Sequence, residues 1–405
     1  MNGPLDGTLV LDLSRVLAGP WASQALADLG ARVIKVERPG RGDDTRSWGP
    51  PYLGSGENRE SAYFLSANRG KESIAIDFKD PRGQSVLLQL ASKADILIEN
   101  YKVGRLKAYG LDYESIRQLN PSIVYCSISG FGQTGLYAKK PGYDFMIQAM
   151  SGLMSITGTE KPTKVGVAVS DLIAGLYATL GILGAYIRAR ETGQGEFIDI
   201  SLLDSQLATL ANQASNFLVS GKSPGLSGNA HPNIVPYQVF ETADDPIVVA
   251  VGNDGQFASL CRAMACEHLS TDSRFISNSM RVANREAIVT LLADELAKQP
   301  AAYWLRALDE VGVPTGPVNT IGEAFADPHV TERKTIMQQE RDDLGTVPGV
   351  RSPVRFQNCV TDEGRAAPAL GDSTEAVLRE IGLSEVEVKS LLNDGVAARP
   401  GKNCK

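Results

Sequence analysis

Residues 8–37 read TLVLDLSRVLAGPWASQALADLGARVIKVE, and this stretch decides the class of fold that we expect. Its first part, Thr8–Leu13, is an apolar run typical of a buried parallel strand, and Arg32–Glu37 reads as a second strand. Between them, Trp21–Leu29 is predicted to be a helix that ends at Gly30. A strand, a helix and a second strand form the unit from which parallel sheets are built.

The same alternation continues along the chain. Ser73–Phe78, Asp95–Asn100 and Ser122–Ile128 read as strands, and Pro81–Ala91 reads as a helix. We therefore predict an α/β fold with a doubly wound parallel sheet, in which ligands bind at the carboxyl ends of the strands. The first strand–helix turn, Ser14–Pro20, has one glycine where the dinucleotide fingerprint needs three, which disfavours a nicotinamide enzyme.

A second, smaller domain is predicted in the second half of the chain. The segment Ser220–Asn229 is rich in glycine, serine and proline and marks a linker. One strand and three helices follow it, namely Ile247–Val251, Phe257–Glu267, Asn284–Lys298 and Ala301–Val311. This order indicates a small α+β domain that ends near His329, after which the helical segment Asp372–Asn393 is predicted.

The composition is that of an ordinary soluble chain. Of the 405 residues, 43% are hydrophobic and 21% are charged, and the net charge of -7 provides no basic footprint for nucleic acid or an anionic membrane. The five cysteines lack a CxxC spacing and the three histidines lie far apart, which argues against structural zinc and a disulfide framework. The chain begins without the basic and apolar regions of a signal peptide. We therefore expect a cytoplasmic protein without a metal, a membrane anchor or a nucleic-acid partner.

The stretch Val165–Asp171 and the apolar run Leu172–Ile187 mark the place where we expect the chemistry. Asp171 is predicted to be the N-cap of a buried central helix, and Gly193 to follow its C-terminus. The run is too short and too rich in glycine for a comfortable membrane span. Unpaired N–H groups and the helix dipole favour an ionised carboxylate at this position. The position allows a structural cap or a nucleophile, and by itself it favours the cap.

Polar and basic residues follow successive strands, at the edge that the carboxyl ends of a parallel sheet share. The residues in these positions are Arg38, Lys79, Asn100, Tyr101, Lys102, Arg105, Lys139 and Lys140. Their cations are able to converge on an anion with several phosphates, although a single loop lysine or arginine is more often simply solvated. At this point two interpretations stay open: these residues bind a nucleotide-like ligand, or they are simply solvated loop residues.

Three shorter features admit a structural and a functional interpretation. The glycine loop Gly252–Gln256 is either a tight turn or a flap whose backbone N–H groups stabilise a reacting carbonyl. Asp144 is either the cap of a helix or a second carboxylate of an active site. His231 lies in a loop without a visible partner, and we interpret it as structural.

Several stretches along the chain form a recognisable set. They are Leu5–Leu13, Leu29–Glu37, Gly42–Arg46, Asp95–Tyr101, Gly142–Phe145, Ser170–Leu172, Gly252–Phe257 and Gly312–Val318. In this order they resemble the class III CoA-transferases, also called the formyl-CoA transferase and carnitine CoA-transferase family. The similarity extends over essentially the whole chain, so it is far more specific than any single motif.

The resemblance implies an interlocked homodimer, in which each chain has a large Rossmann-like domain and a smaller α+β domain. The implied boundaries are residues 1–200 for the first part of the large CoA-binding domain, 201–226 for a linker, 227–328 for the small domain, 329–353 for a second linker, and 354–405 for a C-terminal part that returns to the large domain. The linkers are expected to thread past the partner chain.

The resemblance also implies roles for individual residues. Asp171 matches the catalytic aspartate, and Gly252, Gly255 and Gln256 match the glycine loop of the small domain. The predicted CoA contacts are Val16, Leu17, Arg38, Ile76, Phe78, Lys79, Asn100, Tyr101, Lys102, Arg105 and Lys140. The family motif after the fourth strand is altered in this chain, so that either Arg105 or Lys107 supplies the usual arginine charge.

The substrates are narrowed by further stretches of the sequence. Leu17 stands where formyl-CoA transferases carry a glutamine, which disfavours oxalate and formate. Asp44–Pro51, Ile123–Ile128, Ser151–Met154 and Ile234–Gln238 are similar to the succinyl-CoA:glutarate branch of the family. The resemblance therefore implies transfer of CoA from an acyl-CoA, such as succinyl-CoA, to a dicarboxylic acid, such as glutarate.

The implied mechanism runs through an aspartyl anhydride and an aspartyl-CoA thioester on Asp171. CoA thioesters are then substrates, and neither a permanently bound cofactor nor a metal is expected. Arg46 is the candidate for the distal carboxylate of the acceptor, or else it is a solvated loop arginine.

Two other functions are weighed against the transferase. An α-methylacyl-CoA racemase needs a Gly-His-Asp motif, but Tyr143 occupies the histidine position and cannot shuttle protons near neutral pH. A non-catalytic CoA-binding protein would bind CoA without exchanging it. Asp171 and the glycine loop argue against that function, because binding alone requires neither.

Overall fold

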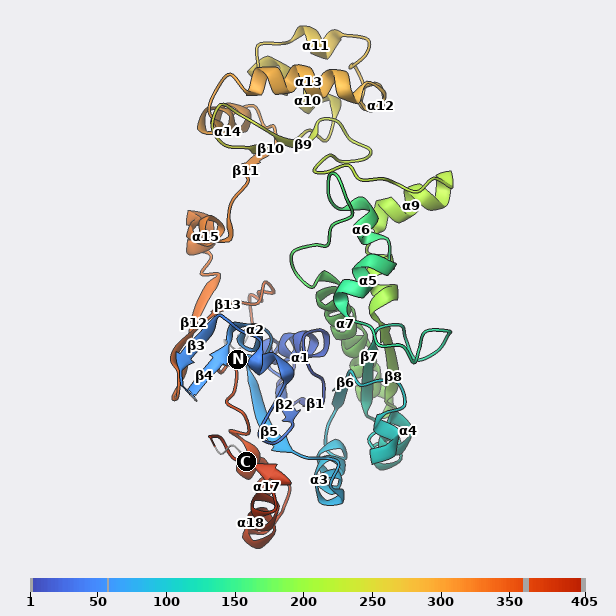
Figure 1. Ribbon diagram of the computed structural model, residues 1–405, viewed down its shortest axis with the longest axis vertical. Helices are drawn as coiled ribbons and strands as arrows, with labels where there is room; N and C mark the ends of the chain where they lie inside the picture. Colours follow the sequence, from blue (N-terminus) through green and yellow to red (C-terminus); the bar gives the residue numbers. More distant parts are fainter. Residues whose placement is uncertain (1–2, 57, 360–363, 402–405) are drawn as a thin grey trace. The chain divides into compact units, whose positions relative to one another are not determined.

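The computed structural model describes residues 3–56, 58–359 and 364–401. Its chain divides into two compact units, which can be followed in Figure 1. The large unit consists of Met1–Leu153, Val165–Ser215 and His329–Lys405, and the small unit consists of Met154–Lys164 and Asn216–Pro328. Residues 360–363 and 402–405 of the predicted C-terminal part lie outside the described residues.

The large unit is built on a seven-stranded sheet. Its strands are β1 (Leu9–Asp12), β2 (Arg32–Glu37), β5 (Lys71–Ile76), β6 (Ile96–Glu99), β7 (Val124–Ser129), β8 (Glu196–Ser201) and β14 (Ala397–Ala398). They lie in the order β14-β5-β2-β1-β6-β7-β8, and all neighbours are parallel except β14 and β5. The order changes direction between β1 and β6. The loops after these two strands therefore border the crevice where doubly wound sheets bind ligands.

The predicted parallel sheet is confirmed. Both β2 and the helix α3 (Pro81–Ala91) begin and end at the predicted residues. The sequence pattern did not indicate β8 or β14. β8 is a partly exposed edge strand with acidic residues among its apolar ones, and β14 has only two residues.

Two hydrophobic cores cover the two faces of this sheet, because successive side chains of a strand point to opposite faces. Val10 and Val33 pack into the core that contains α1 (Ala18–Asp28) and α7 (Val169–Thr192). Leu11 and Ile34, the next residue of each strand, pack on the other face with α3, α17 (Thr374–Glu380) and α18 (Glu385–Asn393). Burial on both faces explains why the strands read as nearly continuous apolar runs.

The helix α7 carries the predicted catalytic residue, and its start corrects one prediction. Ala168 is the N-cap and the helix begins at Val169, so Asp171 lies inside the first turn and is not the cap. Gly193 ends the helix with a left-handed φ of 71°, as predicted.

The prediction that α7 is buried holds for one of its faces only. That face packs against α1, β7 and β8. The other face exposes Leu176, Tyr177, Leu180 and Ile187. By length and composition alone α7 would be able to cross a membrane, a test that the core helix of a soluble protein also passes.

The remaining elements of the large unit, with α6 and α9 at the unit boundaries, can be followed in Figure 1. They are η1 (Asp44–Ser47), β3 (Tyr52–Ser55), β4 (Asn58–Ser61), α2 (Ala62–Ala67), η2 (Leu106–Tyr109), α4 (Tyr113–Leu119), α5 (Asp144–Met150), α6 (Leu153–Ile156), α8 (Leu202–Ala208), α9 (Ala211–Ser220), α16 (Pro328–Glu332), β12 (Ile336–Arg341) and β13 (Gly345–Val350).

The two segments predicted as linkers contain regular structure. Residues 201–226 include α8 and α9, and residues 329–353 include β12 and β13, which pair as an antiparallel hairpin. The side chain of Ser201 caps α8 by accepting a hydrogen bond from the Asp204 N–H, and Leu202 is buried in the core of the large unit. The Ser201 cap and the burial of Leu202 therefore give the start of the first predicted linker a helical structure.

The small unit has an antiparallel sheet in the order β11-β10-β9. Its elements are β9 (Tyr237–Phe240), β10 (Ile247–Ala250), α10 (Asp254–Ala263), α11 (His268–Thr271), α12 (Asn278–Ala283), α13 (Arg285–Leu296), α14 (Ala301–Asp309), β11 (Thr315–Pro317) and α15 (Ile321–Ala326). They enclose a separate hydrophobic core that includes Phe257 and Trp304.

Candidate active site

A cavity of about 210 Å³ lies at the carboxyl edge of the large sheet, where the strand order changes direction between β1 and β6. The structure brings predicted residues from four parts of the chain into its lining: Val16, Leu17, Asn100, Tyr101, Lys102, Lys140 and Asp171. The turn after β1 and the turn after β6 therefore meet the first turn of α7. This is the position at which doubly wound sheets bind their ligands.

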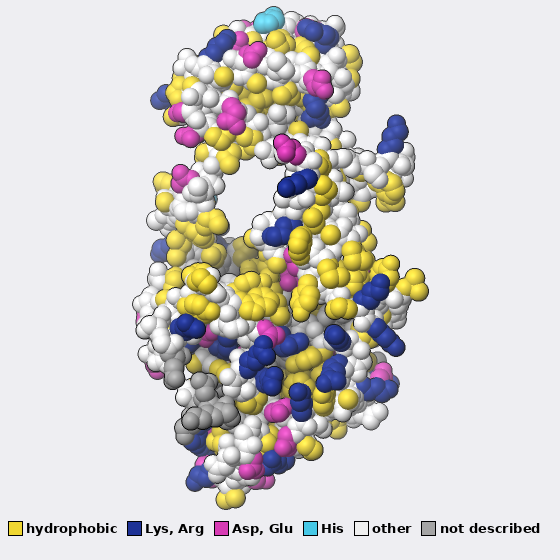
Figure 2. All heavy atoms as spheres, viewed as in Figure 1, with side chains coloured by type: hydrophobic (Ala, Val, Ile, Leu, Met, Phe, Trp, Pro, Cys, Tyr) yellow, Lys and Arg dark blue, Asp and Glu magenta, His cyan; other side chains and the backbone are white. Residues whose placement is uncertain are grey.

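A second cavity of about 210 Å³ adjoins the first and holds other predicted CoA contacts. Arg38, Ile76, Phe78 and Lys79 line it, and Arg15, Asp44 and Tyr101 line both cavities. In Figure 2, lysine and arginine side chains gather on the face of the large unit over the central strands. The two cavities together offer apolar walls and several cations, a combination that suits a phosphorylated nucleotide.

Two sets of predicted residues lie elsewhere. Arg105 lines a different hollow with Lys102 and Lys107, and its guanidinium lies 5.5 Å from the centre of the Tyr109 ring. The glycine loop belongs to the small unit, where Gln256 Oε1 accepts a hydrogen bond of 2.8 Å from the Gly252 N–H. The roles of Arg105, Gly252, Gly255 and Gln256 in CoA transfer stay predictions.

The first turn of α7 is held by side chains from other helices. Asp144, the first residue of α5, accepts the Ser170 N–H at 2.8 Å through Oδ1. Gln148 donates to Asp144 Oδ2 at 2.7 Å and accepts the Val165 N–H at 2.8 Å. Asp144 thus satisfies an N–H group of α7 that a cap of its own would otherwise bind, which explains why Asp171 is not the cap.

A second buried contact fixes the same turn. The Ser170 hydroxyl donates to Gln206 Oε1 at 2.8 Å, and both side chains are fully buried. Ser170 immediately precedes Asp171, so contacts from α5 and α8 fix the backbone next to the Asp171 carboxylate. Neither Gln148 nor Gln206 could be predicted from the sequence, because each contacts residues that are distant in the chain and that only the fold brings near.

Burial, together with a smaller contribution from the negative charge of Asp144, raises the pKa of Asp171 to about 7. We expected the helix terminus to keep Asp171 ionised. This prediction is wrong at acidic pH, because a carboxyl group with the raised pKa is mostly protonated there. The desolvation of a charged carboxylate outweighs the stabilisation by the helix dipole here. Near pH 7 a substantial fraction of Asp171 is still ionised, and a less hydrated carboxylate is a stronger nucleophile.

Tyr63 and Trp48 were not predicted as site residues. Burial raises the pKa of Tyr63 to about 12, with further contributions from the negative charges of Asp171 and Asp144. Its ring meets the Trp48 ring edge to face, with 5.2 Å between the ring centres. Tyr63 therefore stays a neutral hydroxyl in the same electrostatic environment as the two carboxylates.

The structure contradicts the role that was predicted for Arg46. Its guanidinium is buried and binds Glu37 through Nε and Nη2, at 2.8 and 2.6 Å, and Glu60 through Nη1 at 2.5 Å. It also lies 3.6 Å from the centre of the Phe64 ring. Because two carboxylates already neutralise this charge, Arg46 is neither solvated nor available to bind the distal carboxylate of an acceptor.

Arg46→Leu is expected to lower the free energy of unfolding by roughly 3–5 kcal/mol, because it leaves Glu37 buried without its bidentate cation and leaves Glu60 with only the 3.4 Å contact to Arg341. Denaturant unfolding measures this loss. Arg46→Lys is the matched control. It should be destabilised less than Arg46→Leu because it keeps the positive charge, although it loses the bidentate contact with Glu37. An Arg46→Leu variant of unchanged stability whose KM for the acceptor acid rises would restore the substrate role.

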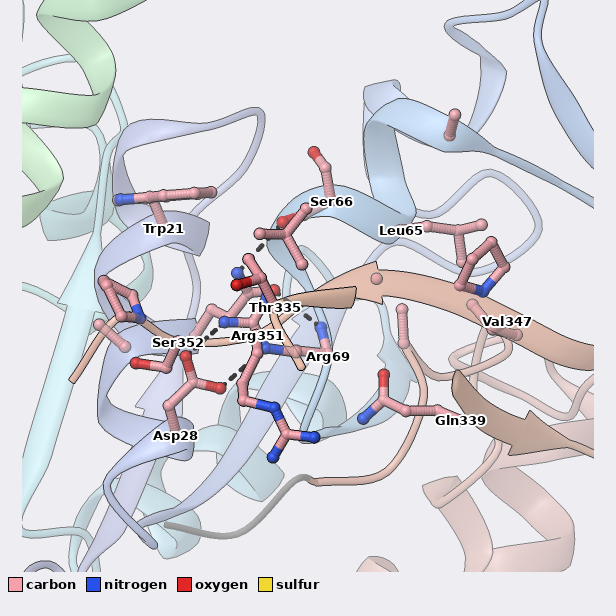
Figure 3. Close-up of a pocket in the computed structure, with 18 of the residues that line it drawn as sticks. Trp21, Asp28, Leu65, Ser66, Arg69, Thr335, Gln339, Val347, Arg351 and Ser352 are labelled. Atoms are coloured by element: carbon pink, nitrogen blue, oxygen red, sulfur yellow. Dashed lines mark hydrogen bonds and ion pairs between the residues drawn. The ribbon is translucent and has the colours of Figure 1, made fainter. Parts of the chain in front are cut away.

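A third cavity, with a volume of about 860 Å³, is larger than these two and shares no lining residue with them. Figure 3 shows Trp21 from α1, Leu65 from α2 and Val347 from β13 at its walls. Asp28 and Arg69 form an ion pair of 2.5 Å at one side. None of the predicted site residues lines this cavity.

Comparison with known proteins identifies relatives over nearly the whole chain. The family model "CoA-transferase family III" matches residues 5–374. A succinate–glutarate CoA-transferase of Agrobacterium fabrum is 48% identical over 382 residues, which are 93% of this chain and 96% of that protein. The human succinyl-CoA:glutarate CoA-transferase is 44% identical over 93% of this chain and 86% of its own length.

A solved structure shares both the fold and the sequence similarity. The crystal structure of a CAIB/BAIF family protein from Brucella suis superposes with a TM-score of 0.84 at 46% identity. The match covers 94% of this chain and all of that chain. The arrangement of strands and helices described above is therefore shared with an experimentally determined relative.

Proposed function

The chain belongs to CoA-transferase family III, and from this premise we propose that it transfers CoA from succinyl-CoA to a free dicarboxylic acid such as glutarate. One observation carries the proposal: Asp171 lines a cavity at the edge of the sheet together with six of the eleven predicted CoA contacts. The choice of a dicarboxylic acid is supported by the relatives in Agrobacterium and human, which act on succinate and glutarate.

The proposed reaction begins when the Asp171 carboxylate attacks the thioester carbonyl of succinyl-CoA. The C–S bond breaks, CoA leaves as the thiolate, and a mixed anhydride of succinate and Asp171 remains. The thiolate then attacks the aspartyl carbonyl, which releases succinate and leaves CoA bound to Asp171 as a thioester. Covalent catalysis thus divides one difficult exchange into easier steps.

The acceptor completes the exchange by the same chemistry in reverse. A glutarate carboxylate attacks the aspartyl-CoA thioester, which forms a new mixed anhydride and releases the CoA thiolate. The thiolate attacks the glutaryl carbonyl, giving glutaryl-CoA and the free Asp171 carboxylate. The backbone N–H groups of the glycine loop are the proposed donors to the oxyanions that form in each step.

The second carboxylate of the acceptor needs a cation other than Arg46. Arg15, Lys102 and Lys140 line the cavity together with Asp171. We propose that one of these three cations binds the second carboxylate of the acceptor. Such a contact would favour a dicarboxylate over the corresponding monocarboxylate.

The proposal is tested with succinyl-CoA and a set of free acids, with the CoA esters identified by mass spectrometry. Glutarate is expected to react roughly 10- to 100-fold faster than butyrate or valerate, which lack the second carboxylate. Equal rates for mono- and dicarboxylic acids would contradict the acceptor class. Binding of CoA without any exchange would contradict the transferase itself and favour a binding protein.

We also propose that the chain forms a homodimer with interlocked linkers, and that the exposed apolar face of α7 lies in its interface. Leu176 belongs to this face and also lines the 860 Å³ cavity, so the two apolar surfaces are continuous. A contiguous exposed apolar surface marks a site of contact with another molecule. A second copy is the proposed occupant.

Light scattering should give twice the 43.3 kDa mass of one chain for the purified protein in the absence of detergent. Leu180→Arg, on the exposed face of α7, is expected to reduce the dimer fraction and the activity. Val386→Arg, at an equally exposed apolar position on α18, is the control and should stay dimeric. A stable monomer, or a protein that needs detergent to stay in solution, would contradict the proposed dimer.

A cytoplasmic location is proposed as well. Cys126, Cys261, Cys266 and Cys359 are all free thiols, which is usual in a reducing compartment. Cell fractionation tests this location.

A further inference from the structure

The turn between β1 and α1 has an unusual backbone. Val16 adopts a φ of 70°, in the left-handed region that β-branched residues seldom enter. Val16 also lines the cavity that contains Asp171. A strained residue in the wall of an active site needs contacts that keep it in place.

Asp43 supplies the contact to Val16 itself. The Val16 N–H lies 3.2 Å from each carboxylate oxygen of Asp43. The Asp43 side chain is completely buried, and its Oδ1 also accepts the N–H and the hydroxyl of Thr45, at 3.0 and 2.9 Å. Asp43 therefore joins the N-terminus of η1 to the strained turn.

Lys35 connects Asp43 to the other side of the same turn. Its ammonium is completely buried, 2.9 Å from Asp43 Oδ2, and it donates to the Ser14 carbonyl at 2.8 Å. Burial by itself would raise the pKa of Asp43, but Lys35 and the hydrogen bonds from Thr45 lower it to about 2. Asp43 is thus a permanent anion whose position is set by the middle of β2.

The rest of the turn is held just as firmly. Asn100, which follows β6, accepts the Arg15 N–H at 2.8 Å and donates to the Arg15 carbonyl at 2.6 Å. Asp12 accepts the Ser14 N–H at 2.8 Å. Every residue from Ser14 to Val16 is therefore bound by a side chain, and Asp43 is the partner of the one residue with a strained backbone.

We propose that Asp43 is a positioning residue for CoA transfer, which holds Val16 in its left-handed conformation and thereby shapes the Val16–Leu17 turn in the wall of the Asp171 cavity. This proposal rests on the proposed function, because the turn matters only if an acyl-CoA lies between it and Asp171. Without Asp43, Val16 is expected to relax to a negative φ, which rotates the peptide that it shares with Leu17. The thioester would then bind without the alignment that attack by Asp171 needs.

Asp43→Asn tests the proposal with little change in volume. The asparagine has a single acceptor oxygen, for which Lys35 and Thr45 compete, so its NH₂ group is left facing the Val16 N–H. We expect kcat for succinyl-CoA to fall by about 10- to 100-fold with a smaller change in KM, as misalignment predicts. Asp112→Asn is the matched control, since Asp112 also caps a short helix through the N–H and hydroxyl of a nearby residue, and kcat should not change.

Val16→Gly in the Asp43→Asn background provides the rescue, because glycine adopts a φ of 70° without strain. The double variant is expected to regain a large part of the lost kcat. Wild-type kcat in Asp43→Asn, or a double variant no faster than Asp43→Asn, would overturn the positioning role.

A measurement of stability keeps the proposal testable if Asp43→Asn does not fold, and it is independent of the proposed function. At an ordinary φ, alanine is more stable than glycine, whereas at a positive φ the order is reversed. Val16→Gly should therefore melt at a higher temperature than Val16→Ala. The opposite order would show that the turn is not strained and would overturn the proposal even in an active enzyme. If wild type lacks CoA transfer while this order holds, the proposed function fails and the strained turn stands.

Discussion

Asp171→Asn is expected to lower kcat for CoA transfer by ~10⁴-fold or more, the usual cost of removing a nucleophile. Asparagine keeps the volume of the side chain at the start of α7, but its amide cannot form an anhydride with the acyl group of succinyl-CoA. The rate of glutaryl-CoA formation, followed by mass spectrometry, measures the effect. Because the cavity keeps its other lining residues, the affinity for CoA should change little.

Asp144→Asn is the matched control for this loss. It removes a carboxylate from the same environment but leaves the proposed nucleophile intact, and asparagine is also a good cap for the Ser170 N–H. It should therefore keep measurable transfer. Comparable activity in Asp171→Asn and the wild type would exclude the aspartyl mechanism, whatever the state of Asp144.

The pH dependence of the rate is expected to follow the ionisation of Asp171. Only the carboxylate attacks, so kcat/KM should rise with pH and level off above the pKa of about 7. The Asp144 charge raises this pKa, so its removal in Asp144→Asn lowers the pKa of Asp171 and moves the acid limb to lower pH. Below pH 7, the variant should then retain more of its own maximal rate than the wild type does.

Profiles of kcat/KM against pH for both proteins test this prediction. Asp112→Asn, a substitution outside the Asp171 cavity, should leave the acid limb where it is. A limb that does not move in Asp144→Asn, or moves to higher pH, would mean that Asp144 does not act on Asp171 through its charge.

Much of the fold could be predicted because its signals are local. β2 is rich in β-branched apolar residues, Val33, Ile34 and Val36, and α3 begins with a proline after a capping aspartate, so both were found with their observed bounds. β8 was missed because its polar residues hide the pattern of an edge strand, and β14 because two residues carry no pattern. The exposed face of α7 could not be told from a buried one, since apolar residues surround the helix on all sides.

Part of the lining of the Asp171 cavity could be predicted from the sequence, but its interactions could not. Residues that follow strands were placed at the correct edge, because the topology of a parallel sheet determines where they go. The pairing of Arg46 with Glu37 and Glu60 depends on how η1 packs against β4, which the sequence does not indicate. The cap from Asp144 joins residues 26 positions apart, and the raised pKa of Asp171 arises from burial that only the folded chain provides.

The central claim is that CoA passes through a covalent bond to Asp171, and trapping with hydroxylamine tests it most directly. The enzyme is incubated with succinyl-CoA and hydroxylamine and then digested, and the peptide that contains Asp171 is examined by mass spectrometry. The expected result is a hydroxamate on Asp171 that forms only with the acyl-CoA and is absent from Asp171→Asn. Turnover under these conditions with Asp171 unmodified, or with the hydroxamate on Asp144 instead, would contradict the claim.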